Sequence, residues 1–173
     1  VQQVREWISA GDLFQANLTA CAEQQLNGPV DPLALYRRLR RHCPAPFGGL
    51  MLASCEEAVL STSPERFLQV SGTGLVETRP IKGTRPRHDD PTQDADAAAE
   101  LVCSAKDRAE NVMIVDLMRN DLGRVCRNGS IEVPQLVGLE SYRQVHHLTS
   151  VVTGQLNDPS ELAGLLRACW PGG

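Results

Sequence analysis

Apolar residues recur along this chain at two spacings, which divide it into expected helices and strands. Spacings of three and four residues place apolar side chains on one side of a helix. They predict helices over residues 1–10, 31–42, about 92–103, 105–122 and from 158 onward. Gly11 follows the first of these, Asp31 precedes a proline at the start of the second, and Ser104 begins a motif that resembles a capping box. Thr92 or Asp94 is the expected N-cap of the third helix.

Alternating apolar and polar residues predict β-strands in the remaining stretches. The expected strands are residues 13–20, 47–53, 58–62, 67–71, 75–79, 130–133, 135–142 and 146–156. Gly72 and Gly74 favour a hairpin turn between two of them, and the polar residues 85–95 are expected to form an exposed loop. Because strands and helices come in unequal blocks, the expected fold class is α+β, with largely antiparallel β-sheets packed with helices.

The composition of the chain argues against two classes of function, nucleic-acid binding and membrane association. The chain has 173 residues and a net charge of −4, which argues against a nucleic-acid binder that neutralises phosphates. No apolar run reaches the roughly 18 residues of a transmembrane helix, so no membrane partner is expected. The six cysteines form no CxxC pair and are interpreted as reduced thiols. We therefore expect a cytoplasmic protein.

The stretch 105–122 is the first candidate for chemistry. Its apolar residues cover most of the helix circumference, which predicts burial, yet Glu110 and Asp121 fall on one face together with Leu117. A buried carboxylate is costly unless it is paired or binds a metal. Two interpretations stay open: ion pairing with a nearby arginine (Arg108, Arg119 or Arg124), or a Mg²⁺ ligand. A nucleotide-binding strand that ends at Asp116 would need a phosphate-binding loop, which the chain lacks.

The segment 77–87 is the second candidate. Four cations lie within nine residues here, namely Arg79, Lys82, Arg85 and Arg87. Gly83 lets the backbone approach a ligand closely, so the segment indicates a local anion site. Nearby positive charge favours the neutral form of an amine, which is a nucleophile. Lys82 is therefore a candidate nucleophile, and a solvated basic loop is the alternative.

Two further motifs carry candidate acids and bases. Glu65, in Ser63-Pro-Glu-Arg-Phe67, is either a general acid or the ion-pair partner of Arg66. His146 and His147 are adjacent in an expected strand, so they point to opposite faces and at most one serves a given pocket. A structural role is the alternative for that histidine.

Together these motifs resemble those of the chorismate-utilising enzymes, a family that includes anthranilate synthase component I, isochorismate synthase and aminodeoxychorismate synthase component I. The resembling segments are residues 11–19, 63–67, 79–85, 107–124, 145–148 and 171–173, in the family's order. The resemblance covers the whole chain. It implies an anthranilate-synthase-like fold and makes residues 1–173 the central part of a longer chorismate-binding catalytic domain, truncated at both ends.

The resemblance also implies residue roles. Lysine at position 82 resembles the aminodeoxychorismate synthases, whereas anthranilate synthases have alanine there. In those enzymes the lysine adds at C2 of chorismate and ammonia then enters at C4, giving 4-amino-4-deoxychorismate, a precursor of p-aminobenzoate and folate. By resemblance Lys82 is the nucleophile and Glu65 the acid/base near C4. The remaining expected site residues are Gly83 and Thr84 as chorismate contacts, His147 over the ring, and Glu110 as a Mg²⁺ ligand.

Ammonia is expected from a glutamine amidotransferase, as a separate subunit or a fused domain. Two alternatives stay open. One is anthranilate synthase component I or another chorismate-utilising enzyme. The other is a non-catalytic remnant or partner-binding module that retains the fold.

Overall fold

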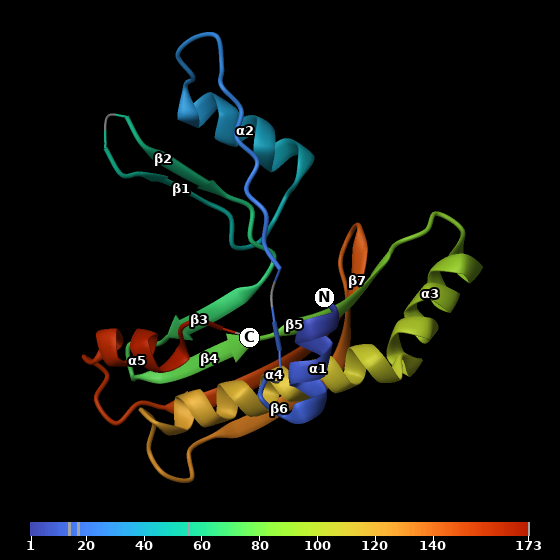
Figure 1. Cartoon of the computed structure of the whole chain (residues 1–173), viewed down its shortest axis with the longest axis vertical. Helices are drawn as coiled ribbons and strands as arrows, with labels where there is room; N and C mark the ends of the chain where they lie inside the picture. Colours follow the sequence, from blue (N-terminus) through green and yellow to red (C-terminus); the bar gives the residue numbers. More distant parts are fainter. Residues whose placement is uncertain (14, 17, 55, 173) are drawn as a thin grey trace.

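A computed structural model describes residues 1–13, 15–16, 18–54 and 56–172 of the chain. The helices are α1 (Gln2–Ala10), α2 (Pro32–His42), α3 (Pro91–Cys103), α4 (Ala105–Gly123) and α5 (Leu162–Cys169). The strands are β1 (Gly49–Leu52), β2 (Ala58–Ser61), β3 (Arg66–Val70), β4 (Leu75–Arg79), β5 (Ile81–Pro86), β6 (Glu132–Ser141) and β7 (Val145–Gln155). Figure 1 shows a main sheet flanked by helices, with α2, β1 and β2 projecting away from it.

The main sheet is built around β7. One edge of β7 pairs with β6, and the other edge pairs first with β5 and then with β4, which in turn pairs with β3. Every one of these pairings is antiparallel. Pro80 separates β4 from β5 because proline has no backbone N–H to donate within the sheet. The expected α+β class with largely antiparallel sheets is confirmed.

The core lies between α4 and the sheet. Ile114, Met118 and Leu122 of α4 are buried and pack against Val76 and Val152 of the strands. Burial of apolar side chains is the main stabilising contribution to such a core. The expectation that this helix is buried all round is wrong, because one side of it meets the sheet while the opposite side stays open.

A groove of about 580 Å³ lies between α4 and β6. Val112 of α4 is 39% exposed beside it. Three further apolar or basic residues, Arg108, Met113 and Leu136, help to line it.

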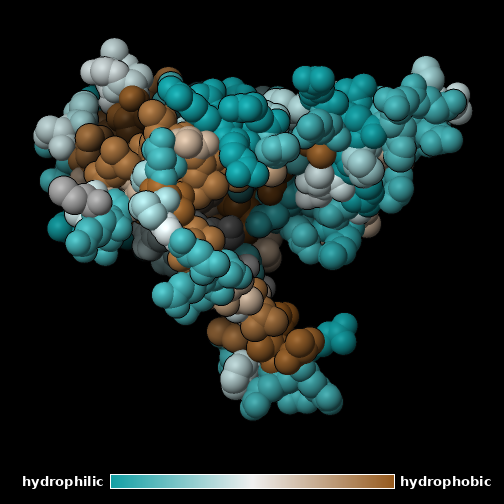
Figure 2. Space-filling view, turned by 90° about the horizontal axis from the view of Figure 1, so that it is seen from above, coloured by the Kyte–Doolittle hydropathy of each residue, from teal (hydrophilic) through white to brown (hydrophobic). Residues whose placement is uncertain are grey.

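The projecting unit consists of the β1–β2 hairpin and α2. Asp31 caps α2, as expected, by accepting a hydrogen bond from the backbone N of Leu33 at 2.9 Å. Apolar side chains such as Leu35, Met51 and Val59 are exposed on this unit. Figure 2, which views the molecule from this end, shows that apolar surface in brown beside the polar surface in teal.

Two expectations from the sequence, for residues 13–20 and 85–95, need correction. The described residues of the expected strand 13–20 form no strand, while Phe14 and Asn17 lie outside the described part of the chain. The expected loop 85–95 is shorter than predicted, because β5 extends to Pro86 and α3 begins at Pro91.

The N-cap of α3 also differs from the expectation. It is Asp90, whose carboxylate accepts hydrogen bonds of 2.9 Å from the backbone N atoms of Thr92 and Gln93. Thr92 and Asp94, the expected caps, therefore lie within the first turn of the helix. Aspartate is among the strongest N-cap residues because its side chain satisfies the free N–H groups of that turn.

Helix α5 begins at residue 162, later than expected, and one strand, β6, spans the two strands predicted within 130–142. No helix in the described ranges is long and apolar enough to span a bilayer. The described cysteines at positions 21, 43, 103, 126 and 169 are free thiols.

Candidate active site

A β-bulge in β5 is the centre of the candidate site. Ile81 pairs with Thr149 of β7, and Thr84 pairs with His147, so Lys82 and Gly83 together stand opposite one residue of β7. Gly83 has a φ of 84°, a left-handed conformation that glycine adopts without steric cost. Bulges re-aim side chains and are common beside active sites. Lys82 and Gly83 thus form a bulge within a strand.

Gly83 also packs tightly against the helical layer. A Cβ atom at this position would lie 2.8 Å from Cβ of Asp107 and 2.9 Å from Cδ1 of Leu101. The space that glycine leaves open is therefore filled by α3 and α4. This contact explains glycine at position 83 by protein packing, whereas the sequence suggested room for a ligand.

Thr84 and His147 meet across the strand pair. The Thr84 hydroxyl lies 2.8 Å from Nδ1 of His147, and the ring of Tyr142 lies edge-on to the imidazole with the ring centroids 5.7 Å apart. Burial lowers the pKa of His147, while a hydrogen bond to the backbone of Gly83 and the charges of Glu140 and Glu65 act in the opposite direction. The net lowering keeps the imidazole neutral at pH 7. His146 points the other way, as the strand alternation predicted.

Glu65 joins the same neighbourhood. Its Oε1 accepts a hydrogen bond of 2.8 Å from the backbone N of Ile81, the residue before Lys82. Arg66 does not pair with Glu65, because its guanidinium donates to Glu77 instead. The ion-pair alternative for Glu65 is therefore wrong. Glu65 lines a cavity of about 300 Å³, together with Thr78, Met118 and Pro171.

The arginines of the basic segment are paired with carboxylates of the protein. Arg79 lies 2.8 Å from Glu77, and Arg87 lies 2.8 Å from Asp94. Arg85 binds Glu100 at 3.0 Å and Asp107 at 3.3 Å. The idea that these guanidinium groups form an open anion site is not supported by this arrangement.

Lys82 differs from its basic neighbours. It is partly buried, and no ion pair or hydrogen bond of its ammonium group is found among the described residues. The amine therefore has no carboxylate of the described chain to neutralise it. Lys82 and Thr84 lie on β5, Glu65 bonds the β5 backbone at Ile81, and His147 bonds Thr84. These four expected residues are thus attached to one short stretch of β5, although Glu65 and His147 line different cavities.

Glu110 lies apart from this group, on α4. Its side chain is 44% exposed and lies 3.7 Å from the ammonium of Lys106, one turn earlier. Asp121, expected on the same face, is buried and lies 3.5 Å from Arg124. The helix therefore separates the environments of the two acids. Within the described part of the chain, no three His, Cys, Asp or Glu side chains are grouped so as to hold a metal ion.

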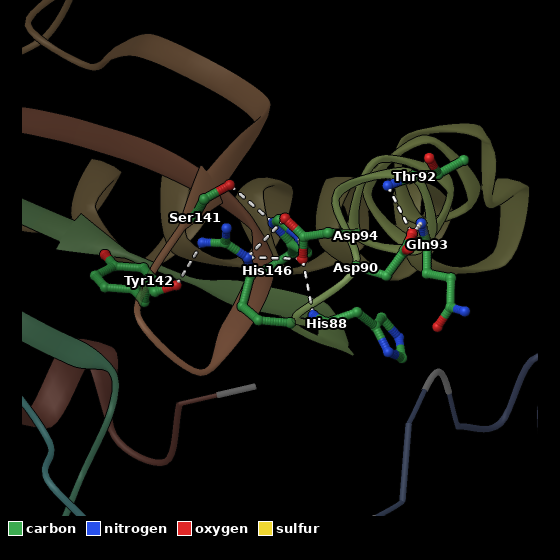
Figure 3. A network of polar contacts seen from close by, with 9 residues as sticks. His88, Asp90, Thr92, Gln93, Asp94, Ser141, Tyr142 and His146 are labelled. Carbon is green, nitrogen blue, oxygen red and sulfur yellow. Dashed lines mark hydrogen bonds and ion pairs between the residues drawn. The ribbon is translucent and has the colours of Figure 1, made fainter.

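Two polar networks, one partly buried and one buried, were missed by sequence reasoning. Ser141, His146 and Asp94 are linked by hydrogen bonds of 2.8 and 3.0 Å (Figure 3). Elsewhere, Asn111 of α4 bonds Ser150 and the backbone of Leu148 on β7. The acids at positions 89–94 are a weak sequence signal for the network around Asp94, because acids in such a segment are also typical of a solvated loop. The second network has no such signal, since a single Asn in an apolar helix is not diagnostic.

Comparison with known proteins gives a consistent result. A model of the family described as chorismate binding enzyme matches residues 1–173. The chain is 46% identical over 172 residues to aminodeoxychorismate synthase component 1 of Salmonella typhimurium, covering 99% of this chain and 37% of that protein. It is also 46% identical over 173 residues to an aminodeoxychorismate synthase of Streptomyces pristinaespiralis, covering 100% of this chain and 24% of that protein.

Solved structures of chorismate-utilising enzymes have a similar fold. Anthranilate synthase component I from Streptococcus pneumoniae superposes with a TM-score of 0.73 and 30% identity, covering 96% of this chain and 35% of that chain. An isochorismate synthase structure from Bacillus anthracis gives a TM-score of 0.66 and 29% identity, covering 84% of this chain and 39% of that chain. The chain thus spans well under half the length of these relatives, between 24% and 39%.

Proposed function

Because this chain belongs to the chorismate binding enzyme family, we propose that it supplies the lysine-bearing part of an aminodeoxychorismate synthase active site. The position of Lys82 carries the proposal. Lys82 lies in the bulge between Ile81, which holds Glu65, and Thr84, which holds His147. The relatives from Salmonella typhimurium and Streptomyces pristinaespiralis bear this enzyme's name.

The first step we propose is attack by the Lys82 amine on C2 of the chorismate ring. The new C–N bond pushes the ring double bonds toward C4, where the C–O bond breaks. The hydroxyl leaves as water with a proton from Glu65, acting as general acid. A covalent lysine intermediate divides one difficult substitution into two easier ones.

The second step reverses the electron shift. Ammonia forms a bond to C4, the double bonds move back, and the C2–N bond breaks, so that Lys82 leaves as an amine. The carboxylate of Glu65 then takes a proton from the new ammonium group at C4. The balance is chorismate plus ammonia giving 4-amino-4-deoxychorismate plus water. Neutral His147, held by Thr84, is suited to contact the ring without adding charge.

Glu110 is the proposed Mg²⁺ ligand. Its half-exposed carboxylate lies 3.7 Å from the exposed ammonium of Lys106. Because surface ion pairs of this kind are weak, the carboxylate oxygens of Glu110 remain able to bind a metal ion. Mg²⁺ in proteins is commonly held by one or two carboxylates together with water and substrate oxygens, which fits a single contribution from this chain. When bound, the ion would neutralise a carboxylate of the substrate.

A glutamine amidotransferase is the proposed source of ammonia. The name of the Salmonella relative, component 1, implies a further component of that enzyme. The product of the proposed reaction is a precursor of p-aminobenzoate and folate, and we propose that the protein acts in the cytoplasm.

Product analysis tests the function. The intact protein is incubated with chorismate, an ammonium salt and Mg²⁺, and the products are separated by liquid chromatography and identified by mass. We expect 4-amino-4-deoxychorismate. Anthranilate as the main product would instead identify an anthranilate synthase, and chorismate binding without turnover would identify a binding module.

A further inference from the structure

The strand that carries the candidate site is paired along one edge only, although the backbone O of Pro80 and the backbone N of Arg87 extend its pairing with the β7 side past its two ends. β5 is an edge strand, and Pro80 and Pro86 at its two ends have no N–H to donate. The bulge at Lys82 and Gly83 shifts the β5–β7 register by one residue. A slip of one residue exchanges the two faces of a strand. Side-chain contacts that lock the register beyond this bulge therefore add to the backbone pairing that places Thr84 opposite His147.

Asp94, in the first turn of α3, contacts one residue of β7 and the two residues that directly follow β5. Its carboxylate accepts hydrogen bonds from Nε of Arg87 at 2.8 Å, from the backbone N of His88 at 3.0 Å, and from Nε2 of His146 at 3.0 Å. Arg87 and His88 directly follow β5, whereas His146 belongs to β7. One side chain thus ties the end of β5 and the start of β7 to α3 (Figure 3).

The partners of Asp94 are themselves fixed. Arg87 also donates from Nη1 to the backbone O of Tyr142 at 2.9 Å, and the Ser141 hydroxyl lies 2.8 Å from Nδ1 of His146. His146 is 3% exposed. The Arg87 guanidinium, above all, holds the pKa of Asp94 far below its usual range, so the carboxylate is ionised at neutral pH.

We infer that Asp94 is a positioning residue for the Thr84–His147 pair. Neighbouring residues of a strand point to opposite faces. Holding His146 toward α3 therefore aims His147 at Thr84, and holding Arg87 fixes β5 in the register that places Thr84 there. Of the two measurements that test this inference, only the enzyme kinetics depend on the proposed function; the titration of His147 does not.

The test compares Asp94→Asn with Asp96→Asn in the intact protein. Asp96 is an exposed acid on the same helix. Enzyme kinetics give kcat and KM at a temperature where both variants are fully folded. Nuclear magnetic resonance of ¹⁵N-labelled histidine gives the pH titration of His147, whose signal is assigned by its loss in His147→Gln.

In Asp94→Asn we expect kcat to fall by about 10- to 100-fold with KM little changed, the loss that is typical when a group that orients a metal-ligating side chain is removed. We also expect the lowered pKa of His147 to rise toward about 6.5, because a loosened strand admits water. Once His147 is less buried, the charges of Glu65 and Glu140 and the Gly83 backbone, which all favour its protonated form, act with less opposition. Asp96→Asn should change neither quantity.

A lower melting temperature with unchanged kcat and unchanged His147 titration would overturn the inference, since Asp94 would then only stabilise the fold. If the intact protein makes no aminodeoxychorismate, the proposed function fails, and the His147 titration still decides the role of Asp94. If Asp94→Asn does not fold, Arg87→Gln, which keeps the Asp94–His146 bond, is measured in the same way. An unchanged His147 in that variant would equally overturn the inference.

Discussion

Glu65 accepts a hydrogen bond of 2.8 Å from the backbone N of Ile81, and this bond joins two motifs that lie 16 residues apart in the chain. It places a carboxylate beside the bulge that carries Lys82. The bond engages only Oε1, and Glu65 also lines a cavity of about 300 Å³.

Two substitutions separate the structural and chemical roles of Glu65. The amide oxygen of Glu65→Gln still accepts from Ile81, so we expect normal stability and a kcat lowered by about 10²- to 10⁴-fold, the usual contribution of a general acid. Glu65→Ala leaves the Ile81 N–H unpaired and should in addition lose about 1–3 kcal/mol of unfolding free energy. Thermal melts and kinetics check both, with exposed Glu57→Gln as control. Normal turnover in Glu65→Gln would rule out the acid role.

Gly83→Ala is expected to be severely destabilising. An added Cβ meets Asp107 and Leu101 at under 3 Å, and the residue has a positive φ as well. Gly129→Ala is the matched control, since Gly129 has a φ of 77° with nothing within 4 Å of the added atom. The difference between the two variants isolates the packing cost, which we expect to be about 1–3 kcal/mol. Denaturant titration measures it, and equal losses would contradict the packing explanation.

The sequence predicted most elements of the main sheet because their patterns are local. Alternation located β3 and β4, and the helix α4 was located from its apolar residues and from Ser104, whose hydroxyl accepts from the backbone N of Asp107 at 3.3 Å. β5 was missed because two prolines and a glycine interrupt its alternation. Its strand conformation depends on pairing with β7, more than 60 residues later in the chain.

Only part of the candidate site could be predicted, because its contacts also join residues that are far apart in the chain. Local patterns singled out Lys82 and Glu65 as candidates, and the motif resemblance assigned their roles and chose His147 over His146. No local pattern shows that Arg66 pairs with Glu77 rather than Glu65, or that Arg85 is neutralised by acids on two helices. Charge counts along a sequence therefore overstated the positive field near Lys82.

Acid should erase the stabilising effect of Asp94. Its pKa is lowered in the folded protein, chiefly by Arg87, so its contribution is fully present above the unfolded pKa of about 3.9 and is lost as the pH falls below that value. The melting temperature of Asp94→Asn should therefore lie below that of the parent by a constant amount between about pH 5 and 8. The gap should narrow below about pH 4. Melts across this range check it, and a gap independent of pH would contradict the ionic role.

Glu110→Gln should raise the Mg²⁺ concentration that gives half-maximal activity by about 10-fold or more, because a neutral amide is a weaker ligand for a hard cation. Asp116→Asn is the control, since Asp116 is an exposed acid on the same helix, paired with Arg119 at 3.0 Å. Activity is measured while Mg²⁺ is titrated. If both variants need the same Mg²⁺ concentration as the parent, Glu110 serves only as the ion-pair partner of Lys106.

Lys82 should form a covalent adduct with the chorismate ring when ammonia is withheld. Its amine has no carboxylate partner among the described residues, and it sits in a bulge bounded by the residues that hold Glu65 and His147. Intact-mass measurement of the protein with chorismate and Mg²⁺ should show the adduct, and peptide mapping should place it. This chain has two lysines, so Lys106→Ala is a natural control and should retain the adduct.

Lys82→Ala and Lys82→Arg should both lose the adduct and the amination at C4, because neither side chain offers a neutral primary amine. Water or ammonia would then attack C2 directly, giving isochorismate-type or anthranilate-type products at a reduced rate. Lys82→Arg keeps the positive charge, so its failure would separate nucleophilic from electrostatic action at this position. An adduct on another residue, or aminodeoxychorismate formed by Lys82→Ala at the parent rate, would show that Lys82 is not the nucleophile.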